Sequence, residues 1–258
     1  MRVVSLASGS CGNCLFIETE QSKVLIDAGV SPNYIQKALT SLGTKLADIN
    51  ALILTHAHRD HAAYASELLA LDIPCYLSEQ TATILKLSGS KVKFIQAEQE
   101  VFFANLTFNS FALSHDCQQP LGFLIKNKKR TLVVATDLGT VTPVVLSALK
   151  QADLAVFEAN HDLNLLHNSS YPWHLKKRIA SSVGHLSNKM AGFALAAAAS
   201  GKEQKVLLAH LSEVNNRPDL ALATVKQILT RFQIDSIQLA VAPRLLTLHW
   251  VSDGDIPA

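Results

Sequence analysis

The stretch Leu54-Thr-His-Ala-His-Arg-Asp-His61 brings three imidazoles and one carboxylate into six residues, directly after a short apolar run typical of a strand. Side chains alternate along an extended segment, so His56 and His58 can point the same way toward one metal ion. Asp60 and His61 come after the turn and can reach a second ion a few ångströms away. The pattern predicts a two-metal hydrolase; the alternative is a polar loop that carries ordinary surface histidines.

The composition of the 258-residue chain indicates a substantial buried core. Hydrophobic residues make up 48% and charged residues 17%, while the net charge of +2 neither demands nor excludes a nucleic-acid partner. The sequence has no signal-peptide pattern and no apolar run of about 18 residues, and its four cysteines are sparse. We therefore expect a reduced, cytoplasmic protein without membrane contact, folded as one domain over residues 1–258.

Apolar periodicity and turn residues divide the chain into strands and helices. Strands are predicted over 2–7, 14–19, 23–27, 51–54, 74–78, 92–95, 100–103, 105–113, 121–126, 131–135, 153–157, 205–209, 237–240 and 245–250. Helices are predicted over 32–42, 62–71, 79–87, 142–150, 162–167, 172–181, 187–200 and 218–231. Two runs of strands, with helices between and after them, favour a mixed α/β sandwich over a Rossmann sheet.

Residues that can bind metal recur just after predicted strands. His115, Asp137 and His210 each follow an apolar run, and His185 precedes an alanine-rich helix. Taken alone, a histidine at a strand end is more often a hydrogen-bonded structural residue. Together with the 54–61 loop, however, these residues supply the ligands that two metal ions need.

These motifs resemble the metallo-β-lactamase fold superfamily, and the resemblance runs from end to end of the chain. It implies an α/β fold, a four-layered αββα sandwich in which two mixed sheets are flanked by helices. By resemblance, one metal site is formed by His56, His58 and His115 and the other by Asp60, His61 and His210. In the same scheme Asp137 bridges the two ions, and Asp27 is a structural aspartate after an early strand.

Several stretches narrow the resemblance to one group. Diiron relatives carry glutamate where this chain has His58, and the 47 residues between Asp137 and His185 leave no room for the large cap of β-CASP nucleases. The motifs most similar to the YycJ/WalJ group are Ser8-Gly-Ser-Cys-Gly-Asn13, Ser114-His-Asp116, Thr136-Asp-Leu-Gly139, Glu158-Ala-Asn-His-Asp162 and His210-Leu-Ser-Glu-Val-Asn-Asn216. That group is regarded as bacterial metal-dependent exonucleases, so the resemblance implies a nuclease acting on DNA.

The expected reaction is hydrolysis of a phosphodiester by a hydroxide that bridges two divalent cations, zinc or manganese. Asp60 can accept the proton of the nucleophile as well as bind metal. By resemblance, His185 oriented by Glu158 protonates the leaving oxygen or stabilises the transition state. The alternatives for His185 are a further metal ligand or a helix cap. His161 is expected either beside the site, where it would support a ligand or touch substrate, or on the surface.

Basic residues beside aromatic ones are the candidate phosphate contacts. We expect substrate binding by Lys176, Lys177, Arg178 and Asn216. Tyr171 and Trp173 lie next to the three cations in the sequence, although a solvated surface would have the same composition. Asn216 follows the last expected ligand, and its alternative role is in a loop that caps the helix from Pro218. A second basic cluster, Lys126-Asn-Lys-Lys-Arg130, is more typical of a solvated hairpin turn.

Two other functions compete with the nuclease. One is a small-molecule metallohydrolase of the same fold, acting on a thioester, a lactone or a cyclic phosphate; activity on polynucleotides against small esters separates the two. The other is a binding protein that kept the fold without metal. The complete set of ligands argues against that second alternative.

Overall fold

The computed structural model describes residues 1–245, and its strands form two sheets. The first sheet follows chain order from β1 at one edge to β6 at the other. Its strands are β1 Arg2–Ala7, β2 Cys14–Glu18, β3 Lys23–Ile26, β4 Ala51–Ile53, β5 Cys75–Leu77 and β6 Val92–Phe94. The pairs β1–β2 and β2–β3 are antiparallel, whereas the pairs from β3 to β6 are parallel. The first sheet is therefore mixed.

The second sheet has the order β13-β12-β11-β10-β9-β8-β7. Its strands are β7 Glu100–Phe103, β8 Leu106–Ala112, β9 Leu121–Lys126, β10 Thr131–Ala135, β11 Leu154–Glu158, β12 Gln204–Ala209 and β13 Ile237–Val241. Pairs from β7 to β10 are antiparallel and pairs from β10 to β13 are parallel. This sheet is mixed as well, so the expected pair of mixed sheets is confirmed.

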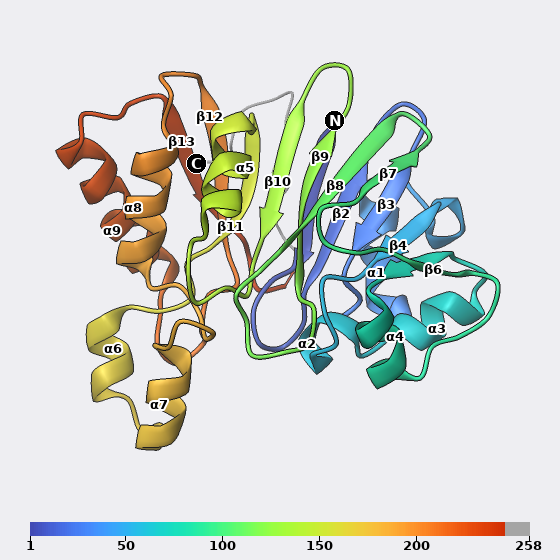
Figure 1. Ribbon diagram of the computed structural model, residues 1–258, viewed down its shortest axis with the longest axis horizontal. Coiled ribbons are helices and arrows are strands. Elements are labelled where there is room, and N and C mark those ends of the chain that lie inside the picture. The colour runs from blue at the N-terminus through green and yellow to red at the C-terminus, as the bar shows by residue number, and fades with distance from the viewer. Residues whose placement is uncertain (246–258) are drawn as a thin grey trace.

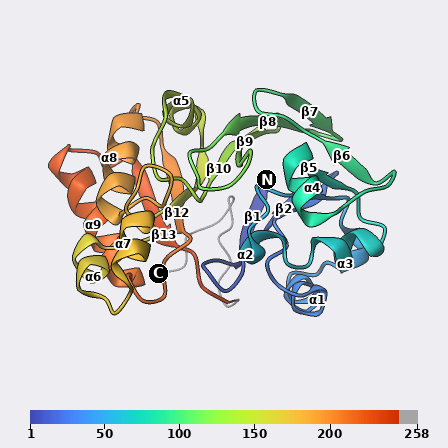
Figure 2. The same cartoon turned by 60° about the horizontal axis from the view of Figure 1, so that its bottom comes forward.

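Helices cover the outer face of each sheet, which gives the expected four-layered αββα sandwich (Figure 1, Figure 2). The helices on the first sheet are α1 Pro32–Ser41, α3 Ala65–Ala70 and α4 Glu79–Leu85. The helices on the second sheet are α5 Pro143–Gln151, α8 Asn188–Ala198 and α9 Pro218–Arg231. The remaining short helices are the 3-10 turn Leu46–Asp48, α2 Arg59–Ala62, α6 Leu163–Asn168 and α7 Trp173–Ile179.

The alternation of side chains along the strands produces three apolar layers. In β2, Phe16 packs toward the helices of its own sheet, while the next residue, Ile17, packs between the two sheets. In β10, Val133 and Val134 divide in the same way. Because successive residues of a strand point to opposite faces, one continuous apolar run can fill two layers at once. This burial of both faces explains why hydrophobic residues make up 48% of the chain.

The predicted helix over 62–71 is wrong in its bounds, because the chain forms two helices there, α2 and α3. The carbonyl of Asp60 accepts a hydrogen bond from the backbone N–H of Asn13 at 2.7 Å, and the N–H of Tyr64 donates to Ala28 at 3.0 Å. Both groups would otherwise pair within one helix. The loops around residues 13 and 28 therefore interrupt the helix, and Asp60 lies inside α2 rather than before it.

The predicted strand over 245–250 falls almost wholly outside the described residues. Only its first residue, Leu245, is described, and it forms an isolated bridge with Ala7. Within residues 1–245, every helix is too short or too polar to cross a membrane.

Candidate metal centre

Strand ends of both sheets supply the side chains of the site. His56 follows β4, His115 follows β8, Asp137 follows β10 and His210 follows β12. Asp27, Asp137 and His210 have φ angles of 66°, 61° and 57°, so the backbone turns sharply at these points. The left-handed region is uncommon for residues other than glycine, and such backbone strain clusters at functional sites.

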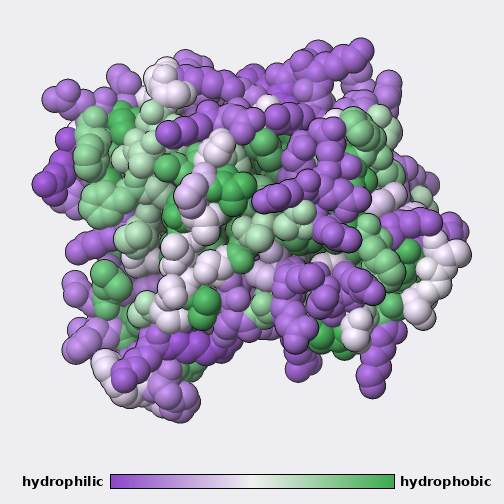
Figure 3. Space-filling model, viewed as in Figure 1, coloured by the Kyte–Doolittle hydropathy of each residue, from purple (hydrophilic) through white to green (hydrophobic). Residues whose placement is uncertain are grey.

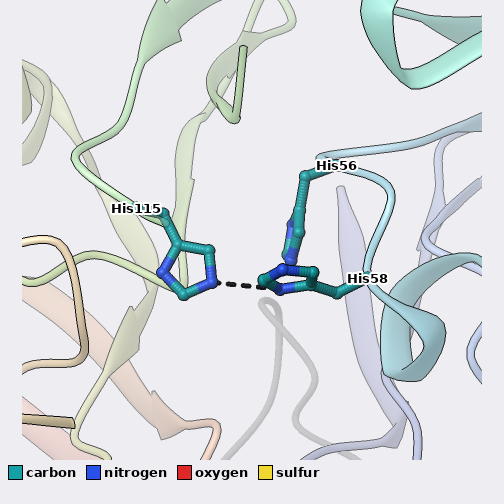
Figure 4. A group of neighbouring side chains, drawn as sticks. All are labelled: His56, His58 and His115. Carbon is teal, nitrogen blue, oxygen red and sulfur yellow. Dashed lines mark hydrogen bonds between the residues drawn. The ribbon is translucent and has the colours of Figure 1, made fainter. Parts of the chain in front are cut away.

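The first cluster consists of three imidazoles, His56, His58 and His115, which converge from two loops (Figure 4). Nε2 of His115 lies 3.2 Å from Nδ1 of His58. The Nδ1–H of His115 donates to the carbonyl of Gly184 at 3.1 Å, which leaves Nε2 as the nitrogen with the lone pair. Nδ1 of His56 lies 3.0 Å from the hydroxyl of Thr55, and its Nε2 has no hydrogen-bond partner among residues 1–245. The cluster therefore offers imidazole lone pairs to a common point.

The second cluster consists of Asp60, His61 and His210. Oδ2 of Asp60 lies 3.6 Å from Nε2 of His61 and 3.3 Å from Nε2 of His210. The Nδ1–H of His61 donates to Oδ2 of Asp27 at 2.7 Å, so Nε2 is again the nitrogen turned to the centre. Hydrogen bonding of the outer ring nitrogen to a carboxylate is the usual support of a metal-binding histidine.

Asp137 lies between the two clusters. Its Oδ2 is 3.0 Å from Nε2 of His61, and its Oδ1 is 3.8 Å from Nε2 of His115. The carboxylate is buried, and Oδ2 has no hydrogen-bond partner among residues 1–245. Oδ1 also lies 3.3 Å from Nδ1 of His210, so the carboxylate is within 4 Å of residues of both clusters and is suited to bridge two cations.

Burial and carboxylates together set the protonation of the site. Burial lowers the pKa of His56 well below its usual value and also lowers the pKa of His58, so both rings are neutral. Burial opposes charge on His210 too, but the surrounding carboxylates, Asp137 foremost, raise its pKa to about 10. The carboxylates in and around the second cluster, Asp27, Asp60, Asp137 and Glu158, therefore stabilise positive charge there, and protons and metal cations compete for them.

Glu158, fully buried at the end of β11, orients two imidazoles. Its Oε1 accepts hydrogen bonds from Nδ1 of His185 at 2.8 Å and from Nδ1 of His210 at 3.0 Å. Its Oε2 accepts from the backbone N–H groups of Leu138 and Leu186 at 3.1 and 3.0 Å. Burial acts against the charge, but His185 and the hydrogen bonds lower the pKa of Glu158 to about 2. The ionised carboxylate thus fixes the tautomer of both rings.

The residues of the site fit divalent metal ions. Nε2 of His56 and Oδ2 of Asp137 are buried, and neither finds a hydrogen-bond partner in the described part of the chain. Buried polar atoms of native proteins are nearly always paired. Neutral imidazoles and carboxylates are ligands of divalent cations, and a cation bound at each cluster would satisfy both atoms.

Comparison with known proteins agrees with this geometry. The sequence profile of the beta-lactamase superfamily domain matches residues 22–211. Exodeoxyribonuclease YycJ of Bacillus anthracis is 36% identical to this chain over 230 residues, which cover 87% of each protein. Exodeoxyribonuclease WalJ of Streptococcus pneumoniae serotype 2 (strain D39) is 33% identical over 228 residues, which cover 85% of each. The chain belongs to the β-lactamase superfamily.

Within that superfamily it falls in the YycJ/WalJ group, as the sequence motifs implied. The superfamily fold is also found in YhfI from Bacillus subtilis, a metallo-β-lactamase fold protein. The two structures align with a TM-score of 0.74 over 97% of this chain and 99% of the other, at 17% identity. At that identity the likeness concerns the fold. Group membership and the clusters of residues that could hold a metal ion make this superfamily member a metal-dependent hydrolase.

The basic residues predicted to bind substrate differ in exposure and in their distance from the site. Lys177 and Arg178 are exposed on α7, beside the site. Lys176 on the same helix donates from Nζ to the carbonyl of His167 at 2.7 Å, so it holds α6 and α7 together. The basic cluster 126–130 forms the turn between β9 and β10, at the opposite end of the sandwich from α7 (Figure 1).

Asn216 is not placed to touch a substrate, contrary to the prediction. Its side chain is 5% exposed, and its Nδ2 donates to the carbonyls of Ala159 and Asn160 at 2.9 and 3.1 Å. Its Oδ1 accepts from Nδ2 of Asn188 at 2.9 Å. The amide is fully used in joining three loops. His161 is also buried, at 1% exposure, which excludes the surface alternative, and burial lowers its pKa to about 4.

Sequence reasoning assigned no role to Asn13 and Asp116, which the structure brings to the site. Nδ2 of Asn13 lies 3.4 Å from Oδ2 of Asp60 and 2.9 Å from Nε2 of His61. Oδ1 of Asp116 lies 3.4 Å from Nε2 of His115, and its Oδ2 forms an ion pair with Arg178. Both residues fall in stretches that carry the resemblance to the YycJ/WalJ group. Their position in those motifs was the signal that could have identified them.

The substitution Asp27→Asn tests whether the hydrogen bond from His61 to Asp27 supports metal binding at the second cluster. Asparagine tolerates the positive φ of this position, but it replaces the charge that holds His61 at 2.7 Å. We expect the affinity for one of the metal ions to fall by about 10- to 100-fold. Competition with a chromogenic chelator measures it, with the exposed Asp219→Asn as the matched control. Equal affinities in wild type and Asp27→Asn would contradict this role.

Proposed function

We propose that the protein is a DNA exonuclease that hydrolyses phosphodiester bonds with two divalent metal ions. The observation that carries the proposal is the pair of ligand clusters on either side of the buried carboxylate of Asp137. The names of the relatives support DNA as the substrate, since YycJ and WalJ are both exodeoxyribonucleases.

Each cluster would hold one ion in this scheme. His56, His58 and His115 would bind one ion, and Asp60, His61 and His210 the other, with Asp137 bridging. Two such ions would lower the pKa of a shared water to give a hydroxide near neutral pH and would stabilise charge on the phosphate. Five imidazoles and the carboxylate of Asp60, around a bridging carboxylate, are ligands that suit zinc or manganese.

The chain's own residues would then move the protons. Asp60 is 24% exposed in its side chain and lies at the edge of the second cluster, where it can accept the proton of the nucleophile. His185 is 18% exposed, and its Nδ1 is held by Glu158, so its Nε2 is free for substrate. We assign His185 to protonation of the leaving oxygen, with Glu158 stabilising its imidazolium form.

A time course on end-labelled nucleic acid tests the proposal. Single- and double-stranded DNA and RNA would be incubated with protein loaded with zinc or manganese, beside a His58→Ala variant. We expect stepwise shortening of DNA that the variant lacks, and the order of products gives the polarity. Metal analysis of the same samples by mass spectrometry should give two ions per chain.

Other products would change the conclusion. Internal cuts from the first time points would make the protein an endonuclease. If metal-loaded protein cut no polymer but hydrolysed a thioester, a lactone or a cyclic phosphate, the small-molecule alternative would replace the nuclease.

A further inference from the structure

The helices α6 and α7 form an arm that projects from the end of the sandwich where the metal clusters lie (Figure 1, Figure 2). The arm comprises residues 163–179. It contributes little to the core, since Leu166 is its one buried side chain and α7 buries none. Its surface is mainly hydrophilic in the space-filling view (Figure 3). Because so few side chains of the arm are buried, the arm adds little to the stability of the fold, and this favours a functional role for it.

Both ends of the arm are tied to the catalytic residues. α6 starts after Asp162, which caps it and follows Glu158 by four residues. At the other end, the backbone N–H of His185 donates to the carbonyl of Ile179 at 2.9 Å. Arg178 pairs with Asp116, whose other oxygen lies 3.4 Å from Nε2 of His115. The arm therefore starts four residues after Glu158 and ends in contact with His185 and Asp116.

The exposed chemistry of the arm is aromatic and cationic. Trp173 is 62% exposed, and Nζ of Lys177 lies 5.5 Å from the centroid of its ring. The one carboxylate within residues 162–179 is that of Asp162, which serves as the N-cap and accepts from the N–H groups of Asn164 and Leu165 at 2.9 and 3.0 Å. An indole with an ammonium group beside it offers a stacking platform and a phosphate contact in one place.

We propose that an unpaired DNA strand enters the site along this arm, with one base stacked on Trp173 and a neighbouring phosphate bound by Lys177. The proposal rests on the nuclease function proposed above and gives its substrate as a single-stranded end. Trp173 and Arg178 are separated by five residues of α7, about 7 to 8 Å along the helix axis. A strand whose scissile phosphate lies at the metal clusters, beside His115, would thus place its next nucleotides over the indole.

A membrane surface is the less favourable partner. The exposed apolar side chains of the arm are Leu163 and Trp173, while a helix bound to a bilayer needs a continuous apolar face. A stacked base needs one exposed ring, which Trp173 supplies.

Binding of a labelled oligothymidylate to the metal-loaded protein tests the proposal, by fluorescence anisotropy. The oligothymidylate carries phosphorothioate links, so that it resists hydrolysis. We expect Trp173→Ala to weaken binding by about 5- to 100-fold, the loss of one stacked base, while Trp173→Phe retains most of the affinity. Lys177→Ala should reduce the slope of log affinity against log salt by about 0.7. The matched controls are Phe102→Ala and Lys128→Ala, exposed residues away from the site, which should bind as wild type.

The outcomes distinguish a failure of the arm proposal from a failure of the proposed nuclease function. If wild type shortens DNA and Trp173→Ala binds the oligothymidylate as tightly as wild type, the arm proposal is overturned and the nuclease stands. If no polymer is cut but Trp173→Ala still weakens binding, the nuclease fails while the arm remains a nucleic-acid surface. Loss of binding to anionic vesicles in Trp173→Ala, with unchanged DNA affinity, would reassign the arm to a membrane and overturn the proposal.

Discussion

Replacing Asp137 by asparagine should lower kcat/KM on DNA by about 10³-fold or more. The side chain keeps its shape, and asparagine tolerates the φ of 61°, so the backbone is expected to stay in place. The change removes the charge of a buried carboxylate that faces both clusters, at 3.0 Å from His61 and 3.8 Å from His115. Metal ions contribute several kcal/mol of transition-state stabilisation, and about 4 kcal/mol corresponds to this factor.

The measurement combines metal content per chain with initial rates on labelled DNA. Asp72→Asn is the matched control, because Asp72 also has a positive φ, of 66°, but its side chain is 80% exposed and pairs with Lys91 on the surface. The control should keep wild-type rates and metal. Full metal content and wild-type activity in Asp137→Asn would show that this carboxylate does not hold the ions together.

Replacing His185 by alanine should lower the rate on DNA by about 10²- to 10⁴-fold, the usual contribution of a general acid. His185 is held by Glu158 at 2.8 Å but remains partly open to solvent, so its removal leaves the buried clusters intact. The metal content should therefore stay at the wild-type value. A loss of one ion per chain would identify His185 as a ligand instead.

A substrate whose leaving group needs no proton distinguishes proton donation by His185 from positioning of the phosphate by His185. A nitrophenyl ester of thymidylate releases an anion that needs no proton, so His185→Ala should hydrolyse it at nearly the wild-type rate. An equal loss on this ester and on DNA would show that His185 positions the phosphate and does not protonate the leaving oxygen.

The candidate ligands could be proposed from the sequence because coordination chemistry dictates the residue types and spacing of a metal site. His56 and His58 alternate on one segment, and His115, Asp137 and His210 each stand where a strand ends. The structure brings all of them together, because β8, β10 and β12 run in the same direction and end at one edge, next to the loop after β4 that carries His56 and His58. The runs of apolar residues predicted a mixed α/β sandwich, and the resemblance to the superfamily implied its two mixed sheets.

The substrate residues could be predicted only in part. Asn216 was expected to touch phosphate, yet three loops distant in sequence surround its amide. The split of the predicted helix 62–71 has a similar origin, since the carbonyl of Asp60 and the N–H of Tyr64 pair with the loops around residues 13 and 28. Hydrogen bonds between segments far apart in the chain leave no local pattern in the sequence.

The sequence by itself determined the candidate metal ligands, the layered α/β class and the membership of the family, because spacing, alternation and residue type are local properties. Tertiary structure alone decided which polar residues are buried, that Asn13 and Asp116 join the site, and that α6 and α7 stand out beside it. The reason is physical: burial and long-range hydrogen bonds depend on how the two sheets pack. That packing sums many weak contacts over the whole chain.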